Sequence, residues 1–140
     1  MGGFDERYFL IFEDADWSLR ARRLGVPLVV DPVVTLDHVV SASFTGDRAL
    51  LGLYYYARNG LLFGHRWRTS TPAADRCGAY RFLRRHVLPQ VTGAWRNGDR
   101  TAALRRQQFL MVAVAHHLRR HYGRAPRWLE AKARRWETQQ

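Results

Sequence analysis

With 140 residues, 46% of them hydrophobic, and a formal net charge of +11, the chain is about one domain long and can bury a core, which excludes a disordered tail. Its one cysteine, Cys77, cannot form an internal disulfide, so we expect a reducing compartment and a cytoplasmic location. No apolar window reaches the roughly 18 residues of a membrane span, and the first residues lack the basic and apolar regions of a signal peptide.

The first elements in chain order are a loop and a helix. Gly2-Gly3 predicts a flexible loop, and Asp5 is suited to cap a short helical turn after it. The composition from Asp14 to Arg23 predicts a helix. Gly25, followed by Pro27, predicts its end.

Two extended segments are expected next. Leu28-Val29-Val30 predicts a buried strand because it is rich in β-branched residues, and Asp31-Pro32 ends it. Residues 33–40 predict a second strand. The first third of the chain therefore alternates between helix and strand, as an α/β domain does.

The rest of the chain has a helical period. Apolar residues recur at helical spacing from residue 50 to about 66, and residues 79–88 and 102–121 are further helical candidates. Residues 70–72 predict a loop. The sequence thus divides into residues 1–47 and residues 48–140.

Three carboxylates stand close together in the stretch FEDADWSLR, which begins at residue 12. Asp16 is four residues before Arg20, a spacing that predicts an ion pair on a helix. Asp14 has no cation three or four residues later, which fits a general base. The alternative is that Glu13, Asp14 and Asp16 only stabilise the helix N-terminus, where negative charge is favourable.

A family resemblance favours catalysis. Residues 2–25, GGFDERYFLIFEDADWSLRARRLG, resemble the family 2 glycosyltransferases, especially their rhamnosyltransferase-like members. That pattern runs Gly-Gly-Phe-Asp-Glu, a hydrophobic stretch, Glu-Asp-x-Asp, then x-x-x-Arg and Gly. PLVVDPVVTLDHVVSAS, residues 27–43, is similar to the strand, Pro, strand, His, Ser order that follows, and YYYARNG, residues 54–60, is similar to a Tyr-Tyr-x-x-Arg-Asn helix. The resemblance covers residues 2 to about 66.

The resemblance implies an α/β fold. Residues 1–47 would form the C-terminal part of a GT-A, Rossmann-like nucleotide-diphosphosugar transferase domain, and residues 48–140 a mainly α-helical, Arg-rich region. The implied activity is inverting transfer of a hexosyl or rhamnosyl group from a nucleotide-diphosphosugar to a glycan or lipid-linked acceptor. By this resemblance Asp14 is the general base, and Glu13 and Asp16 support it.

Further site residues are also implied by the resemblance. His38 is a candidate metal ligand, although a lone His in a strand is also typical of a hydrogen-bonded core residue. The family usually has glycine where this chain has Val40 and Ser41. A divalent cation, Mg²⁺ or Mn²⁺, is implied for the full domain. The residues implied to bind the acceptor are Gly2, Gly3, Phe4, Asp5 and Trp17.

The family's N-terminal half, which binds the nucleotide and carries a metal-holding Asp-x-Asp, has no counterpart in this sequence. We therefore expect the 140 residues alone to bind nucleotide sugar weakly or not at all, and to transfer nothing. A separate N-terminal chain or a homo-oligomer would complete the site.

The charge is unevenly distributed, with a net −4 over residues 1–47 and +15 over residues 48–140. Arginines that flank apolar helices suit the anionic inner face of a membrane, and this predicts a peripheral location. A solvated helical face with extended arginines is the simpler alternative. A non-catalytic basic module that binds nucleic acid is a third, although no nucleic-acid motif is present and the acidic first third would repel phosphate.

Overall fold

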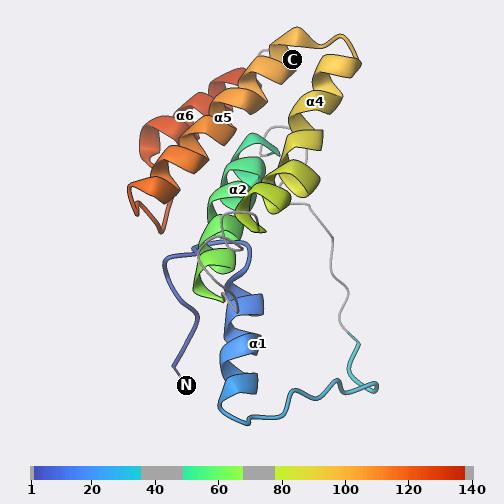
Figure 1. The fold of residues 1–140 in the computed structure, drawn as a ribbon, viewed down its shortest axis with the longest axis vertical. Helices are drawn as coiled ribbons and strands as arrows, with labels where there is room; N and C mark the ends of the chain where they lie inside the picture. The colour runs from blue at the N-terminus through green and yellow to red at the C-terminus, as the bar shows by residue number, and fades with distance from the viewer. Residues whose placement is uncertain (1, 36–48, 68–77, 138–140) are drawn as a thin grey trace.

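The computed structural model describes residues 2–35, 49–67 and 78–137, and Figure 1 shows them as an assembly of helices. No strand occurs in these three ranges, so the predicted α/β fold is wrong for the described part of the chain. The α-helices are α1 (Glu13–Arg23), α2 (Ala49–Arg66), α4 (Leu88–Arg96), α5 (Arg100–Leu118) and α6 (Arg127–Glu137).

The predicted strand at Leu28-Val29-Val30 has no regular secondary structure. Val29 and Val30 are 84% and 89% exposed, so they contribute to no core. β-branched residues favour a strand only where a neighbouring strand and a packed face receive them, and no described segment supplies either. The second predicted strand is irregular from residue 33 to residue 35, and its remainder lies outside the described residues.

Three of the predicted helices are confirmed by α1, α2 and α5. The helix predicted from Asp14 begins one residue earlier and ends at Arg23, followed by Gly25 with φ 72°. The predictions from residues 50 and 102 correspond to α2 and α5. Asp99 caps α5, since its carboxylate accepts a hydrogen bond from the backbone amide of Ala102 over 2.8 Å. Helix α6 was not predicted.

Residues 78–96 form one helical run with a wider turn, the π-helix η2 (Leu83–Val87), directly before α4. The sequence predicts a helix over residues 79–88 only. Instead Pro89 occupies the first turn of α4. Proline lacks an amide donor and its ring crowds the carbonyl four residues earlier, here that of Arg85, which explains the widening.

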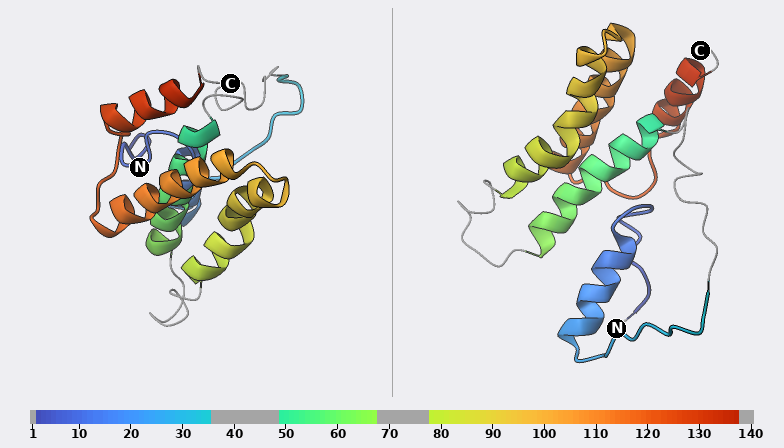
Figure 2. Two further views of the ribbon diagram at one scale, coloured as in Figure 1. Left: turned by 90° about the horizontal axis from the view of Figure 1, so that it is seen from above. Right: turned by 90° about the vertical axis from the view of Figure 1, so that its right-hand side faces the viewer.

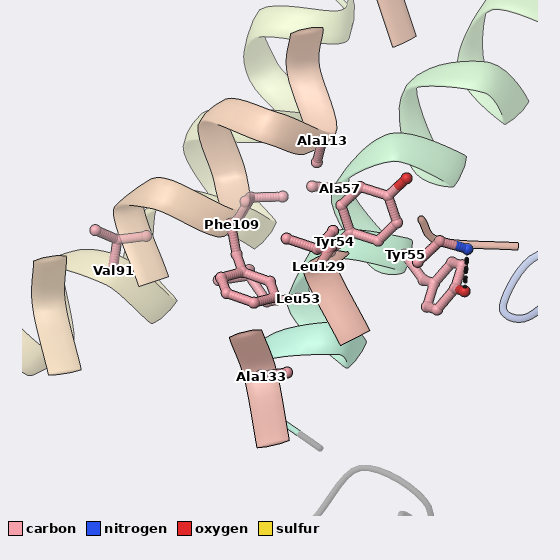
Figure 3. Packing of buried hydrophobic residues seen from close by; sticks show 11 residues of the cluster. Leu53, Tyr54, Tyr55, Ala57, Val91, Phe109, Ala113, Leu129 and Ala133 are labelled. Carbon is pink, nitrogen blue, oxygen red and sulfur yellow. Dashed lines mark hydrogen bonds between the residues drawn. The ribbon is translucent and has the colours of Figure 1, made fainter. Parts of the chain in front are cut away.

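Helix α2 forms the centre of the bundle and packs most extensively against α5 (Figure 1). Helix α4 packs on α5, and α6 closes the far side through a Phe109–Trp136 ring contact. The buried cluster that joins these helices is shown in Figure 3 and comprises Leu53, Tyr54, Tyr55, Ala57, Val87, Val91, Phe109, Ala113, Ala125, Leu129 and Ala133.

Helix α1 lies beside the C-terminal end of α2, outside the bundle of α2, α4, α5 and α6 (Figure 2). The loop before α1 folds back towards α2, so the acidic stretch is held against the central helix although it is distant in sequence. This placement sets the geometry of the candidate site.

Candidate functional site

The three carboxylates of the acidic stretch have different environments. Asp14, in the first turn of α1, is exposed to solvent. One of its carboxylate oxygens accepts a hydrogen bond from the neighbouring Ala15 amide over 2.7 Å. It makes no ion pair with any residue in the described ranges, so its remaining oxygen lone pairs face solvent.

Asp16 is completely buried and fully engaged. The predicted ion pair with Arg20 is confirmed, with 3.0 Å between Nε and Oδ2. Arg66 of α2 also approaches, its Nε 3.2 Å from Oδ1, and the Trp67 indole donates to the same oxygen over 2.8 Å. The Tyr8 hydroxyl donates over 3.3 Å. Asp16 therefore connects α1 to the end of α2 and is not available to a substrate.

Burial raises the pKa of Tyr8, and the nearby Asp16 carboxylate raises it further. The phenol consequently remains a hydrogen-bond donor to Asp16 at neutral pH. Glu13 is partly buried, and its Oε2 atom is enclosed without a hydrogen-bond partner in the part of the chain that the structure describes. Glu13 thus keeps an unused acceptor beside Asp14.

The residues implied to bind the acceptor lie in the loop before α1 and on its first turns. Gly2 and Gly3 are exposed, and the Gly3 carbonyl accepts a hydrogen bond from Arg20 over 2.7 Å. Phe4 is 62% exposed and meets the ring of Trp17 edge to face, with 6.4 Å between centroids. Because Trp17 follows Asp14 by three residues, it shares that face of α1.

Asp5 is held by two arginines rather than open to a ligand. Arg7 binds both of its carboxylate oxygens, and Arg66 pairs with Oδ2. Hydrogen bonds from Arg7 are the main cause that lowers the pKa of Asp5 from 3.8 to about 2. Since Arg66 also reaches Asp16, it bridges the two carboxylates, and Asp5 positions the loop.

The loop before α1 has an uncommon backbone. Phe9, Ile11 and Phe12 have φ of 62°, 66° and 76°, in the left-handed region that non-glycine residues seldom adopt. Such conformations each cost roughly 1–3 kcal/mol and persist only where surrounding structure enforces them. The phenyl ring of Phe12 supplies part of that support, since it packs on the rings of Tyr56 and Phe63 at 5.6 and 5.3 Å.

Two buried polar residues of α2, Asn59 and Arg58, supply the remaining support for the strained loop before α1. The Asn59 amide donates to the Tyr8 carbonyl over 2.7 Å and also to the carbonyls of Leu10 and Ile11. The Arg58 guanidinium donates to the Gly123 carbonyl over 2.7 Å, and more weakly to those of residues 7 and 8. Arg58 and Asn59 are 1% and 0% exposed. They fasten the acidic stretch to the bundle.

A hydrogen-bonded chain extends from Arg58 to α5. Arg58 Nη1 donates to the Tyr54 hydroxyl over 2.9 Å, and that hydroxyl lies 2.9 Å from Nδ1 of His116. Burial raises the pKa of Tyr54, so the phenol stays protonated. Because its oxygen already accepts from Arg58, its O–H group donates a hydrogen bond to Nδ1 of His116. Burial and the neighbouring His121 lower the pKa of His116, which favours the neutral imidazole that this arrangement requires.

His38, the candidate metal ligand, lies outside the described residues. Within residues 2–35, 49–67 and 78–137, no group of three or more His, Cys, Asp or Glu side chains could hold a metal ion. The cation implied by the resemblance therefore has no ligand set in the described structure.

Sequence reasoning missed the partners of the acidic stretch. Tyr8, Arg66 and Trp67 were not assigned to the site, and Arg58 and Asn59 were noted only as a matching motif. The available signal was an Arg-Asn pair inside the otherwise apolar helix α2, because buried polar residues need specific partners.

Comparison with known proteins found no matching family model, no similar curated protein and no similar solved structure. The family resemblance thus stays a prediction. No helix in the described part of the chain is long and apolar enough to cross a membrane.

Proposed function

We propose that the chain supplies the acceptor-activating part of an inverting glycosyltransferase, with Asp14 as its general base. One observation carries the proposal. The two stretches that resemble family motifs, residues 2–25 and 54–60, meet in space although a long segment separates them. They meet through Asn59 and Arg58, whose side chains bind the backbone just before the acidic stretch. This contact supports the proposal because it brings the two motifs together directly before the acidic stretch.

The different environments of Asp14 and Asp16 favour Asp14 as the general base. Asp16 is buried among Arg20, Arg66, Trp67 and Tyr8, so its charge is already neutralised. Asp14 is exposed in the first turn of α1. The loop before it is held by Asn59, and Asp16 after it is held by its buried partners. A base must reach the proton it removes, and Asp14 meets that requirement.

The reaction step assigned to this chain is a proton transfer. The Asp14 carboxylate takes the proton of an acceptor hydroxyl as the hydroxyl oxygen bonds to the anomeric carbon of the donor sugar. The bond from that carbon to the nucleoside diphosphate breaks, and the diphosphate leaves with the electron pair. Attack opposite the leaving group inverts the configuration at the anomeric carbon.

The neighbouring side chains fit the acceptor side of this step. Trp17 lies on the face of α1 that carries Asp14, and the ring of Phe4 packs against it edge to face. Aromatic rings offer a flat apolar surface on which a sugar can pack. Glu13 keeps a supporting role beside Asp14, because its Oε2 atom is enclosed and does not reach a substrate. We assign no step to the divalent cation, because the described residues provide no ligand set for it.

The donor is proposed to be a nucleotide-diphosphosugar and the acceptor a glycan or lipid-linked glycan. A second polypeptide or a second copy would contribute donor-binding groups. The cytoplasmic location predicted from the single cysteine, Cys77, remains part of the proposal.

The test uses cells that produce the protein, so that any second component is present. The gene is deleted, and the sugar composition and linkage of the polysaccharides and lipid-linked glycans are compared with those of the parent. Loss or shortening of one glycan is expected. Unchanged glycans in the deletion strain would refute the proposed function.

Two point variants refine the test. Asp14→Asn should reproduce the deletion, whereas Glu6→Gln, an exposed carboxylate in the loop before α1, should restore the parental glycans. A deletion phenotype rescued equally by both variants would keep the transferase and reject Asp14 as its base.

A further inference from the structure

Helix α5 carries an exposed stripe of three apolar side chains, Leu104, Met111 and Leu118, with the exposed Gln107 and Gln108 beside it between the first two. The exposed fractions of the three apolar side chains are 51%, 61% and 75%. They recur every seven residues, close to two helical turns, so they lie on one face. The opposite face of α5, with Phe109 and Ala113, is buried against the bundle. The stripe therefore remains open after the core has formed.

Both ends of this stripe are positively charged. Arg100 stands exposed at the first residue of α5, and Arg119 and Arg120 are exposed just beyond its last residue. Asp99, which precedes Arg100, caps α5, and Glu130 of α6 is paired with Arg124. The exposed face of α5 thus combines apolar side chains with arginines that form no ion pair with a carboxylate of the described residues.

We infer that this face docks on an anionic lipid surface, with α5 lying parallel to the membrane plane. Leu104, Met111 and Leu118 enter the boundary between headgroups and acyl chains, and the terminal arginines bind the anionic headgroups. Leu104 and Leu118 stand 14 positions apart, which is about 21 Å along the helix axis and suits a helix lying in the interface. The inference is independent of the proposed transferase activity.

Charge complementarity favours lipid over the other possible occupants. Pairing this face with a second copy places arginines against arginines at both ends in an antiparallel arrangement, and side by side in a parallel one. A nucleic acid would satisfy the arginines, but the Leu and Met side chains offer its bases no aromatic ring to stack on. Of these three occupants, an anionic membrane is the one that satisfies both the apolar and the charged groups.

The experiment measures co-flotation of the full chain with vesicles. One set contains phosphatidylcholine alone and the other includes about one third phosphatidylglycerol, at about 0.1 M and about 0.5 M salt. Binding is expected only with the anionic vesicles and should weaken several-fold at the higher salt. Free inorganic phosphate at equal ionic strength should not compete.

The stripe is tested by the double substitution Met111→Gln with Leu118→Gln, which should reduce anionic vesicle binding by about tenfold or more. The matched control is Val29→Gln with Val30→Gln, two residues that are even more exposed but lie outside α5, and it should bind as the parent does. Arg100→Gln with Arg119→Gln should lower both the binding and its salt dependence.

Three outcomes of the vesicle experiment would overturn the inference. The first is a stripe variant that binds anionic vesicles as well as the parent does. The others are a parent chain that binds neutral and anionic vesicles equally well, or that binds neither. A stripe variant that only converts a dimer to a monomer in sedimentation velocity, with vesicle binding unchanged, would assign the face to self-association. Salt-sensitive binding to an oligonucleotide in preference to anionic vesicles would assign the arginines to nucleic acid.

Discussion

The side-chain amide of Asn59 donates to the backbone carbonyl of Tyr8 over 2.7 Å, although 51 positions separate the two residues. The contact fixes the strained loop that leads into α1, and therefore the position of Asp14. Asn59 has no solvent exposure, so it can exchange its protein partners for water only if this part of the structure opens.

Substitution of Asn59 by alanine should release this loop. The Leu10 carbonyl would lose its side-chain donor, and the Tyr8 carbonyl would keep only the Leu10 amide and a weaker contact with Arg58, so we expect a loss of about 1–3 kcal/mol in the free energy of unfolding. Hydrogen exchange in residues 7–12 should accelerate more than exchange in α5, because the strained backbone relaxes locally.

The matched control is Asn97→Ala, an exposed asparagine directly after α4, which should change stability by less than about 0.5 kcal/mol. Equal effects of the two substitutions would show that Asn59 does not hold the loop.

Replacement by asparagine should affect stability very differently at the neighbouring Asp16 and Asp14. Asp16→Asn removes a buried charge that faces Arg20 and Arg66, and breaking such a group typically costs about 3–5 kcal/mol. Asp14→Asn, on the exposed face, should stay within about 0.5 kcal/mol of the parent. Urea unfolding of both variants measures the difference. A stable Asp16→Asn protein would contradict the structural role assigned to Asp16.

The local parts of this arrangement could be predicted from the sequence. The Asp16–Arg20 pair follows from helical spacing, and α2 and α5 follow from apolar periodicity. The roles of Arg66 and Trp67 could not be predicted, because their contacts with Asp16 depend on how α1 meets α2. Asp14 was chosen for lacking a local cation, and the structure agrees that it is unpaired among the described residues.

The close approach of Gly60 to Phe82 gives a packing prediction. A Cβ atom at Gly60 would overlap the ring of Phe82, which is already confined by Phe12 and Tyr56. Gly60→Ala should therefore destabilise the protein by about 1–3 kcal/mol. Shortening the partner with Phe82→Leu should recover part of that loss in the double variant.

Gly64 offers a control in the same helix, because nothing lies within 4 Å of a Cβ built there. Gly64→Ala should stabilise the helix by about 0.5–1 kcal/mol. If both alanine variants were equally stable, the contact between Gly60 and Phe82 would not exist in solution.

Asp5 predicts a pH dependence of stability. Arg7 is the principal cause that lowers the pKa of Asp5 from 3.8 to about 2, so the folded state favours the carboxylate over the acid. The resulting stabilisation is complete above the unfolded value and is lost as pH falls from 3.8 towards about 2. Because Asp5 is only partly buried, added salt should reduce the effect.

Thermal midpoints across this acidic range test the assignment. Asp5→Asn should flatten the profile between those pH values, whereas Glu6→Gln, at an exposed neighbouring carboxylate, should not. An unchanged profile in Asp5→Asn would mean that other carboxylates govern the acid transition.

The failure of the α/β prediction has a physical cause that the sequence does not display. Val29 and Val30 are good strand residues, but strand formation depends on partners, and these side chains are exposed in the structure. Helix α6, in contrast, has a signal in the sequence that the prediction overlooked. Leu129, Ala133 and Trp136 recur at helical spacing between charged residues, as in an amphipathic helix, and this face packs on the bundle.

The most direct test of the central claim is the rate of sugar transfer restored by purified chains. Extract from the deletion strain receives a labelled nucleotide-diphosphosugar and either the parent chain, Asp14→Asn or Glu6→Gln. With Asp14 as the base, the parent and Glu6→Gln should transfer sugar at equal rates, and folded Asp14→Asn should be about 10²–10⁴-fold slower. Transfer by Asp14→Asn at the parental rate would show that Asp14 is not the base.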